Sequence, residues 1–146
     1  MIRLATPTDA DAVTAIAQAA FSHYIPRIGL QPIPMTLDYS AAIDAAKVWV
    51  ATAADTVPGF VLLEDQPDAL LLDVLAVSPS TQGQGIGTSL LTFTEEQARA
   101  RGYRRITFYT HEAMTENLAY YPRHGYVESG RETVHDRRRV FFEKHL

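Results

Sequence analysis

One stretch near the middle of the chain constrains the fold more than any other. Leu70–Val77 is a nearly continuous apolar run that only Asp73 interrupts, a pattern typical of a strand buried on both faces of a sheet. A turn-rich loop follows, and the segment from Ile86 to Gly102 then repeats its apolar residues at the spacing of an amphipathic helix. Arg105–Thr110 predicts the next strand. Because strand, long helix and strand in succession form a right-handed crossover, this stretch predicts a parallel strand pair.

The segments on either side predict the rest of a mixed sheet. Further strands are expected at Ile2–Ala5, Lys47–Ala53, Gly59–Glu64, Tyr126–Ser129 and Arg138–Lys144. Further helices are expected at Ala10–Phe21 with Thr8 as its N-cap, at Asp38–Ala46, and at Ala113–Arg123, where Pro122 disturbs the end. Prolines and a glycine between Tyr24 and Met35 predict an irregular loop or short turns. The charged stretch Arg131–Arg139 has mixed signs, and we interpret it as a solvated turn rather than a ligand site.

Composition limits the classes of protein that this chain can belong to. Its 146 residues, 47% hydrophobic and 21% charged, fit one ordinary globular domain. The net charge of −4 argues against a nucleic-acid partner, because such binding relies on clustered Lys and Arg. No cysteine is present, and the scattered histidines indicate no metal site. The first residues lack the apolar region of a signal peptide and no run is long enough to span a membrane, so we expect a cytoplasmic protein.

The loop Gln82–Gly87 has a glycine at every second position and leads into the amphipathic helix. Glycines let successive backbone N–H groups face one concavity, and a helix N-terminus adds about half a positive charge, so the loop suits a pyrophosphate. It lacks the Lys of a nucleotide P-loop, and Thr88 stands where a dinucleotide-binding fingerprint needs its third glycine. Coenzyme A is then a natural ligand; a plain tight turn is the alternative.

Two motifs resemble the GNAT superfamily of acetyl-CoA-dependent N-acetyltransferases. Val77-Ser-Pro, followed by Gln82-x-x-Gly85-x-Gly87, is similar to the Q/R-x-x-G-x-G/A signature after the fourth strand of that superfamily. Ala119–Tyr126 resembles its second signature, a helix whose tyrosine precedes Gly-Phe or Gly-Tyr by four residues. The resemblance covers nearly the whole chain. It implies a single α/β (α+β) domain over residues 1–146, with a mixed, mostly antiparallel sheet of six to seven strands, flanking helices and a splayed strand pair that holds the cofactor.

The resemblance also implies where acetyl-CoA binds as co-substrate. The pantetheine arm would lie along the fourth strand, and the pyrophosphate would accept hydrogen bonds from main-chain N–H groups, for which glycine leaves room. The implied contacts are Leu75, Ala76, Val77, Gln82, Gly83, Gln84, Gly85, Ile86, Gly87, Thr88, Asn117 and Tyr121. The chain departs from the family at Met114, where relatives often carry Asn. Asn117 lies at a different helical phase, so a surface or capping role is its alternative.

Two residues match the positions that do the chemistry in the superfamily. An alkylammonium has a pKa near ~10, so the acceptor amine needs a base or a water relay to lose its proton. Asp73 resembles the position where many relatives carry a Glu that acts through water; hydrogen bonding to neighbouring backbone is the alternative. Tyr121 matches the tyrosine that donates to the departing thiolate, whereas packing in the core is its alternative, as it is for Tyr120.

The acceptor is expected on the side built by the first helices and the loop between them. The resemblance points there to Phe21, His23, Tyr24, Arg27 and Met35, with His111 after the fifth strand as a second base. For each, plain packing or exposure is the alternative. We expect a small-molecule amine as the acceptor. A protein N-terminal or lysine acetyltransferase, or a non-catalytic acyl-CoA-binding module, are the rivals, and pairing of the last strands across a homodimer is left open.

Overall fold

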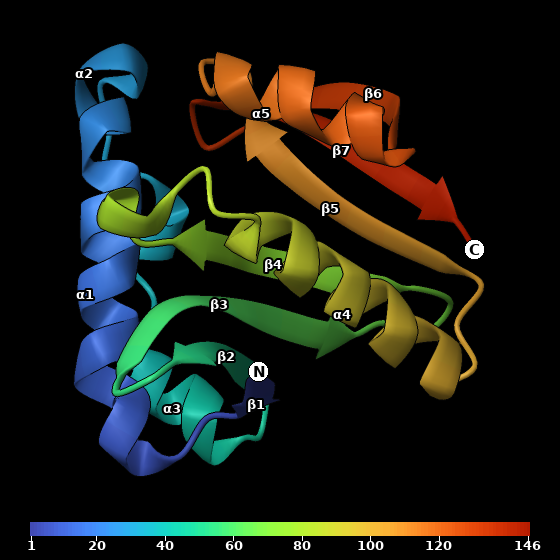
Figure 1. The fold of residues 1–146 in the computed structure, drawn as a ribbon. Helices are drawn as coiled ribbons and strands as arrows, with labels where there is room; N and C mark the ends of the chain where they lie inside the picture. Colours follow the sequence, from blue (N-terminus) through green and yellow to red (C-terminus); the bar gives the residue numbers. More distant parts are fainter.

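The computed structural model describes all 146 residues as one seven-stranded sheet with helices on both faces (Figure 1). The strands lie in the order β1-β2-β3-β4-β5-β7-β6, and β4 and β5 form the parallel pair. Their bounds are β1 Ile2–Leu4, β2 Val48–Ala53, β3 Thr56–Asp65, β4 Leu70–Val77, β5 Arg105–His111, β6 Val127–Val134 and β7 Arg137–His145. The expected mixed, mostly antiparallel sheet and its parallel crossover are confirmed.

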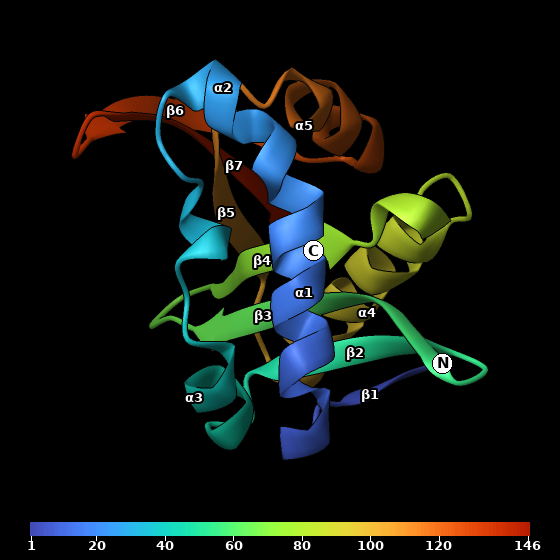
Figure 2. The ribbon, with the colours of Figure 1, turned by 90° about the vertical axis from the view of Figure 1, so that its left-hand side faces the viewer.

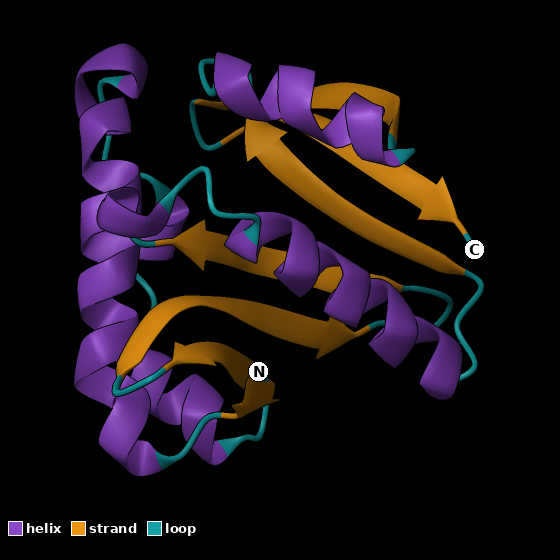
Figure 3. Ribbon diagram, in the orientation of Figure 1, coloured by secondary structure: helices purple, strands orange, loops and turns teal.

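Five α-helices and five short 3-10 turns surround the sheet, and Figure 3 shows the helical segments in purple. The α-helices are α1 Ala10–Phe21, α2 Ile25–Ile28, α3 Tyr39–Asp44, α4 Ile86–Ala100 and α5 Thr115–Tyr120. The 3-10 turns are η1 Pro7–Asp9, η2 Ser22–Tyr24, η3 Ile33–Met35, η4 Pro79–Thr81 and η5 Tyr121–His124. The proline-rich segment after α1 thus forms short turns, as its sequence predicts, and Pro122 ends α5 early. None of these helices has the length and hydropathy needed to cross a membrane.

Two predicted boundaries were wrong because strand pairing extends past residues that usually end strands. β3 begins at Thr56 instead of Gly59 and includes Pro58, whose carbonyl accepts a hydrogen bond from the backbone of the loop after β4. The charged stretch Arg131–Arg139 was predicted as a turn, but its turn consists only of His135 and Asp136, at φ 50° and 63°. The other residues of that stretch belong to β6 and β7.

Helices cover both faces of the sheet. α1 and α3 pack on one face, while α4 packs on the other, and Figure 2 shows α3 and α4 on opposite sides of the strands. Gly59 on β3 permits the close approach of α4, because a Cβ there would lie 2.9 Å from the carbonyl oxygen of Ala76 and 3.1 Å from a methyl group of Leu90.

A β-bulge at Asp73 divides β4 into two parts. The β3–β4 register shifts there, so that Leu72 and Val74 pair with consecutive residues of β3 and Asp73 pairs with none. Leu72 consequently packs in the cluster beneath α4, and Val74 in the cluster beneath α1. The prediction that β4 is buried on both faces was therefore wrong in part: its alternate residues, including Asp73 and Leu75, are half-exposed.

β4 and β5 separate soon after they meet. Their parallel pairing comprises Leu70 with Ile106 and Leu71 with Thr107, and none of the later residues of β4 pairs with β5. Each strand keeps its other neighbour, because β4 continues to pair with β3 and β5 pairs with β7 along its whole length. In Figure 1 the two strands diverge toward their arrowheads. The splayed pair implied by the resemblance is thus present in the fold.

The start of α1 differs from its prediction. Thr8 does not cap the helix; its hydroxyl contacts that of Thr6 instead, and η1 precedes α1. Asp9 organises this turn, because its carboxylate accepts hydrogen bonds from the backbone N–H of Thr6 at 2.8 Å and from both terminal nitrogens of Arg3 at 2.7 and 3.0 Å. The hydrogen bond from Arg3 is the main reason that the pKa of Asp9 falls to about 2.

We expect Asp9→Asn to lower the free energy of unfolding by about 1–2 kcal/mol at pH 7. The folded pKa of Asp9 lies below its unfolded value, so its contribution is complete above about pH 4 and is lost as the pH falls through about 2. Urea denaturation between pH 2 and 7 should show the difference from wild type shrinking at low pH. Asp11→Asn is the control, because Asp11 is an exposed carboxylate in the first turn of α1 and forms no ion pair. A pH-independent loss would contradict this account.

Candidate active site

Two hollows meet where β4 and β5 separate. The first, here called the glycine-loop groove, runs along the end of β4, the loop Gln82–Gly87 and the facing side of α5. The second, here called the Asp73 pocket, lies between β4, β5, β7 and the segment Ile28–Leu37 that covers it. Four residues line both hollows: Phe21, Leu75, Asn117 and Tyr121. A ligand in the groove and another in the pocket would therefore contact the same side chains.

The glycine loop presents an unbroken series of backbone donors. None of the N–H groups from Gln82 to Thr88 donates a hydrogen bond to another backbone carbonyl. Gly83 and Gly85 have φ of 84° and 82°, a left-handed conformation that side chains other than glycine rarely adopt, and Gly85 is the N-cap of α4. Free N–H groups at the start of a helix of this length suit an anionic group, which is the role expected for the loop.

The unpaired edge of β4 continues the groove toward the pocket. Leu75, Ala76 and Val77 pair with β3 on one side, and no strand pairs with them on the other. Their free backbone groups can hydrogen-bond an extended amide-containing ligand as a neighbouring strand would. Every residue expected at the cofactor also lines the groove except Gln84, whose exposed side chain lies outside it.

Tyr121 occupies the junction of the two hollows. The structure brings it there through η5, and its ring packs against Phe108, Tyr126 and Phe142 at centroid distances of 4.3 to 6.3 Å. No protein group hydrogen-bonds its hydroxyl, although the side chain is 7% exposed. Burial raises the pKa of Tyr121 well above its ordinary value, so the phenol stays protonated and available as a donor.

Asp73 brings a carboxylate into the pocket through the bulge in β4. Its side chain lines the pocket and forms no ion pair or hydrogen bond with another protein group. Burial, and then the negative charge of Glu64, raise the pKa of Asp73, while Lys47 opposes the shift. A carboxylate whose pKa is raised is a stronger base than an exposed one, and it is placed where an incoming amine would lie.

His111 lines the same pocket, but its hydrogen bonds do not favour a base. Its Nδ1 accepts a hydrogen bond from the backbone N–H of Ala113 at 3.0 Å, and the backbone N–H of Arg138 donates to its Nε2 at 3.4 Å. Burial, followed by the charges of Arg137 and Arg138, lowers the pKa of His111 and keeps it neutral. Main-chain donors thus face both ring nitrogens, so neither is free to take a proton from a substrate.

Four residues expected at the acceptor do not line the pocket: Met35, His23, Tyr24 and Arg27. Met35 packs against the α1-side core, and its carbonyl accepts a hydrogen bond from Gln18. His23 and Tyr24 line the glycine-loop groove instead. Phe21 and His111 do line the Asp73 pocket, as expected. The difference arises because α1 is followed by η2 and α2, which turn the aromatic residues toward α5 and leave the later prolines to cover the pocket.

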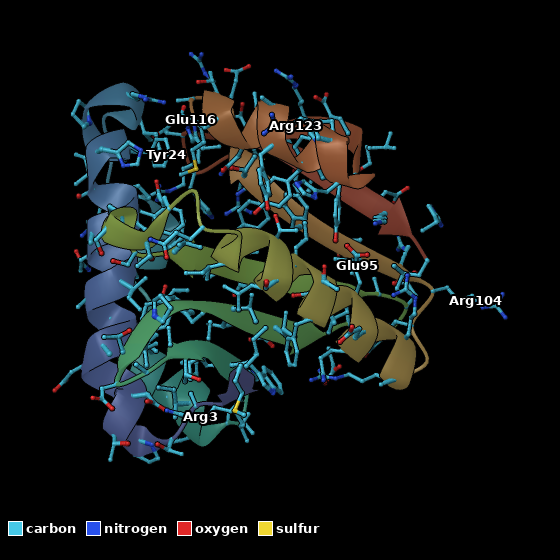
Figure 4. The ribbon with its side chains drawn as sticks, viewed as in Figure 1. Arg3, Tyr24, Glu95, Arg104, Glu116 and Arg123 are labelled. Atoms are coloured by element: carbon cyan, nitrogen blue, oxygen red, sulfur yellow. The ribbon has the colours of Figure 1, made fainter.

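Arg27 was also expected at the acceptor, but it belongs to a clasp between the N-terminal helices and α5. Its Nη1 donates to Glu116 Oε1 at 2.5 Å, and the Tyr24 hydroxyl donates to Glu116 Oε2 at 3.3 Å. Figure 4 shows Tyr24 and Glu116 facing each other across the space between α1 and α5. Arg27 lowers the pKa of Glu116 to about 2. The clasp connects the two halves of the splayed sheet beside the groove.

Sequence analysis missed several lining residues. Tyr120 and Arg123 line the groove, where the Tyr120 hydroxyl lies 3.1 Å from that of Thr88 and the Arg123 guanidinium lies 5.9 Å from the Tyr120 ring. Both residues lie within the second motif, Ala119–Tyr126, and that position was the sequence signal for a place at the site. Arg137 and Arg139 line the Asp73 pocket, although their charged stretch was predicted to be a solvated turn. Alternation along β7 was the signal for these two, once a strand was assigned there.

Solved structures that share this fold include acetyltransferases. PaiA N-acetyltransferase of Thermoplasma acidophilum, in complex with coenzyme A, has a TM-score of 0.84 at 18% identity, covering 100% of this chain and 98% of that one. The ribosomal-protein-S18-alanine N-acetyltransferase of Escherichia coli has a TM-score of 0.79 at 18% identity, covering 99% and 92%. At such identity, these likenesses show a common fold.

Sequence comparison identifies the family. Residues 44–128 match the acetyltransferase (GNAT) domain. Probable N-acetyltransferase 14 of Xenopus tropicalis is 32% identical over 61% of this chain and 45% of its own length, and mycothiol acetyltransferase of Jonesia denitrificans is 35% identical over 47% and 23%. The aligned part thus spans less than half of these curated relatives. The chain belongs to the GNAT acetyltransferases, a family of acyltransferase enzymes.

The glycine loop allows a paired test of its backbone. We expect Gly85→Ala to lower the free energy of unfolding by about 1 kcal/mol, because a Cβ is strained at its positive φ. Gly87→Ala should leave stability unchanged or raise it slightly, because Gly87 lies inside α4 and the nearest atom to its Cβ would be 3.6 Å away. Urea denaturation measures both variants. Equal effects would contradict the conformational argument.

Proposed function

We propose that this protein transfers an acetyl group from acetyl-CoA to the primary amine of a small molecule. The observation that carries the proposal is the meeting of the glycine-loop groove and the Asp73 pocket at Tyr121, through the gap between β4 and β5. Direct transfer between two bound substrates requires such a junction, because the thioester and the amine must come into contact. The proposal includes the expected cytoplasmic location and requires no metal.

The residues of the groove suit acetyl-CoA, which when bound supplies the acetyl thioester. The free N–H groups from Gln82 to Thr88 would hold its pyrophosphate, and Arg123 adds a positive charge on the opposite wall. The unpaired edge at Leu75 and Val77 would bind the amides of the pantetheine arm. Asn117 reaches the same wall, although its amide also donates to Thr110 in the absence of a ligand.

Two side chains would manage the protons. Transfer forms an amide C–N bond and breaks the thioester C–S bond, and an amine that enters as an ammonium ion loses two protons in all. Asp73 accepts the first, directly or through water, so that the nitrogen can attack. Asp73 then releases this proton to solvent. The Tyr121 hydroxyl donates its proton to the departing sulfur, and the second proton of the nitrogen restores the hydroxyl. The lack of a protein partner for this hydroxyl supports that role.

The shape of the Asp73 pocket favours a small acceptor over a protein. Ile33, Pro34 and Leu37 cover it, and its volume is about 80 Å³, whereas the glycine-loop groove measures about 450 Å³. A peptide chain would need an open groove through which its main chain could continue. A protein N-terminal or lysine acetyltransferase is therefore the second candidate, and a non-catalytic acyl-CoA-binding module the third.

Calorimetry with acetyl-CoA tests the binding half of the proposal. We expect Gly87→Trp to abolish binding, because a side chain at Gly87 extends toward Val77 and Tyr120 across the groove. Gln84→Trp is the matched control in the same loop, since Gln84 is exposed and lies outside the groove. Wild-type protein that is folded yet does not bind acetyl-CoA would refute the proposal.

Steady-state kinetics with an amine that the protein acetylates test the chemistry. We expect Tyr121→Phe and Asp73→Asn each to lower kcat by about a hundredfold or more. Tyr121→Phe should keep the wild-type thermal midpoint, because no protein hydrogen bond is lost. The pKa of Asp73 is raised, so the wild-type rate should increase with pH through a value above that of an ordinary carboxyl, and Asp73→Asn should remove this step. Binding without turnover of any amine would favour the acyl-CoA-binding module.

A further inference from the structure

We propose that the acceptor amine also carries a carboxylate, which Arg139 and Arg137 bind at the end of the Asp73 pocket formed by β7. The inference rests on the proposed acetyltransfer and names the class of its acceptor, a small amino acid or a close analogue. It is carried by two guanidinium groups that lack acidic partners and by a buried donor without an acceptor, all in the pocket where the amine must enter.

The arginines around the β6–β7 turn divide into two sets. Arg131 and Arg138 both form ion pairs with Glu112, at 3.1 and 3.4 Å, and neither lines the Asp73 pocket. Arg137 and Arg139 line the pocket and form no ion pair. Glu112 and Glu128 are thus paired with arginines outside the pocket. Glu132 lies opposite Arg139 in the β6–β7 register but forms no ion pair with it, so neither arginine of the pocket has an acidic partner.

Arg139 is arranged to receive a planar anion. Its guanidinium carbon lies 4.2 Å from the centroid of the Tyr109 ring, and this stacking fixes the plane of the group. Its Nε is buried and has no hydrogen-bond acceptor in the protein, and its terminal nitrogens donate to no protein group. Buried donors are normally paired, so the guanidinium as a whole lacks an acceptor. The terminal nitrogens are the donors that a carboxylate in the pocket can reach, and charge assistance makes such hydrogen bonds strong.

The residues beside Arg139 and at the opposite end of the pocket agree with this assignment. His111 lies across from Arg139 in the β5–β7 register and lines the same pocket as a neutral ring, so it adds no competing charge. Asp73 brings the only carboxylate of the pocket lining, from β4. A ligand with one ammonium and one carboxylate group matches a pocket that is acidic on β4 and basic on β7. The apolar cover of the pocket would contact its side chain.

The test compares matched acceptors in steady-state acetylation assays. Each amino acid of a panel is paired with its carboxamide and with the decarboxylated amine, which keep the amine but lose the carboxylate. We expect wild type to have a kcat/KM at least tenfold higher for the best amino acid than for its carboxamide. Arg139→Gln and Arg137→Gln should reduce this ratio toward one, mainly by raising KM for the amino acid, and should leave the Kd for acetyl-CoA unchanged.

Arg138→Gln is the matched control, because Arg138 is adjacent on β7 but pairs with Glu112 outside the pocket. It should keep the wild-type ratio. The proposal would be overturned by a wild-type ratio near one or by faster turnover of the decarboxylated amines. It would also be overturned if protein that binds acetyl-CoA turned over no carboxylated amine. Preference for phosphoethanolamine over β-alanine would overturn the carboxylate assignment. Failure of the proposed function is distinct, because it would appear as absent acetyl-CoA binding.

Discussion

The site depends on the absence of hydrogen bonds between β4 and β5 beyond their first residues. The strands pair only at their first residues, and the bulge at Asp73 then redirects β4. Each strand remains ordered because it keeps a full partner on its other side. The unpaired edges leave polar backbone groups that need partners, so the gap between the strands is suited to a ligand rather than to closure. Both hollows open from this gap.

The distribution of charge separates groups that hold the fold from groups that are free to act. Glu112 and Glu116 each accept from at least one arginine and connect elements distant in sequence, whereas the buried Asp9 joins the consecutive elements β1 and η1. Exposed pairs such as the one at Glu116 contribute little individually, about 0–1 kcal/mol, so the clasp orients α2 and α5 more than it stabilises them. Asp73 and Arg139, by contrast, are half-buried without partners, which is the situation in which a ligand gains most by binding.

The two sides of the site depend on different parts of the chain. The glycine-loop groove is built from main-chain donors, positive-φ glycines and a strand edge, so many sequences can form it. This explains how a chain with 18% identity to PaiA N-acetyltransferase retains the fold over its whole length. The Asp73 pocket is built from side chains on β4, β5 and β7 and from the prolines that cover it. Its side chains are particular to this sequence, and under the proposed function they would select the acceptor.

The sequence alone determined the sheet class, the crossover and the glycine loop, because hydrophobic periodicity and glycine positions are local properties of the chain. Only the tertiary structure decided that Arg27 joins the clasp and that Arg139 enters the pocket, since both outcomes depend on contacts between residues about 30 to 90 positions apart. The sequence pattern predicted Arg131–Arg139 as a turn, with a strand only from Arg138. In the structure β7 begins at Arg137 and pairs with β5, and the alternation of this strand places Arg137 and Arg139 on the side of the site.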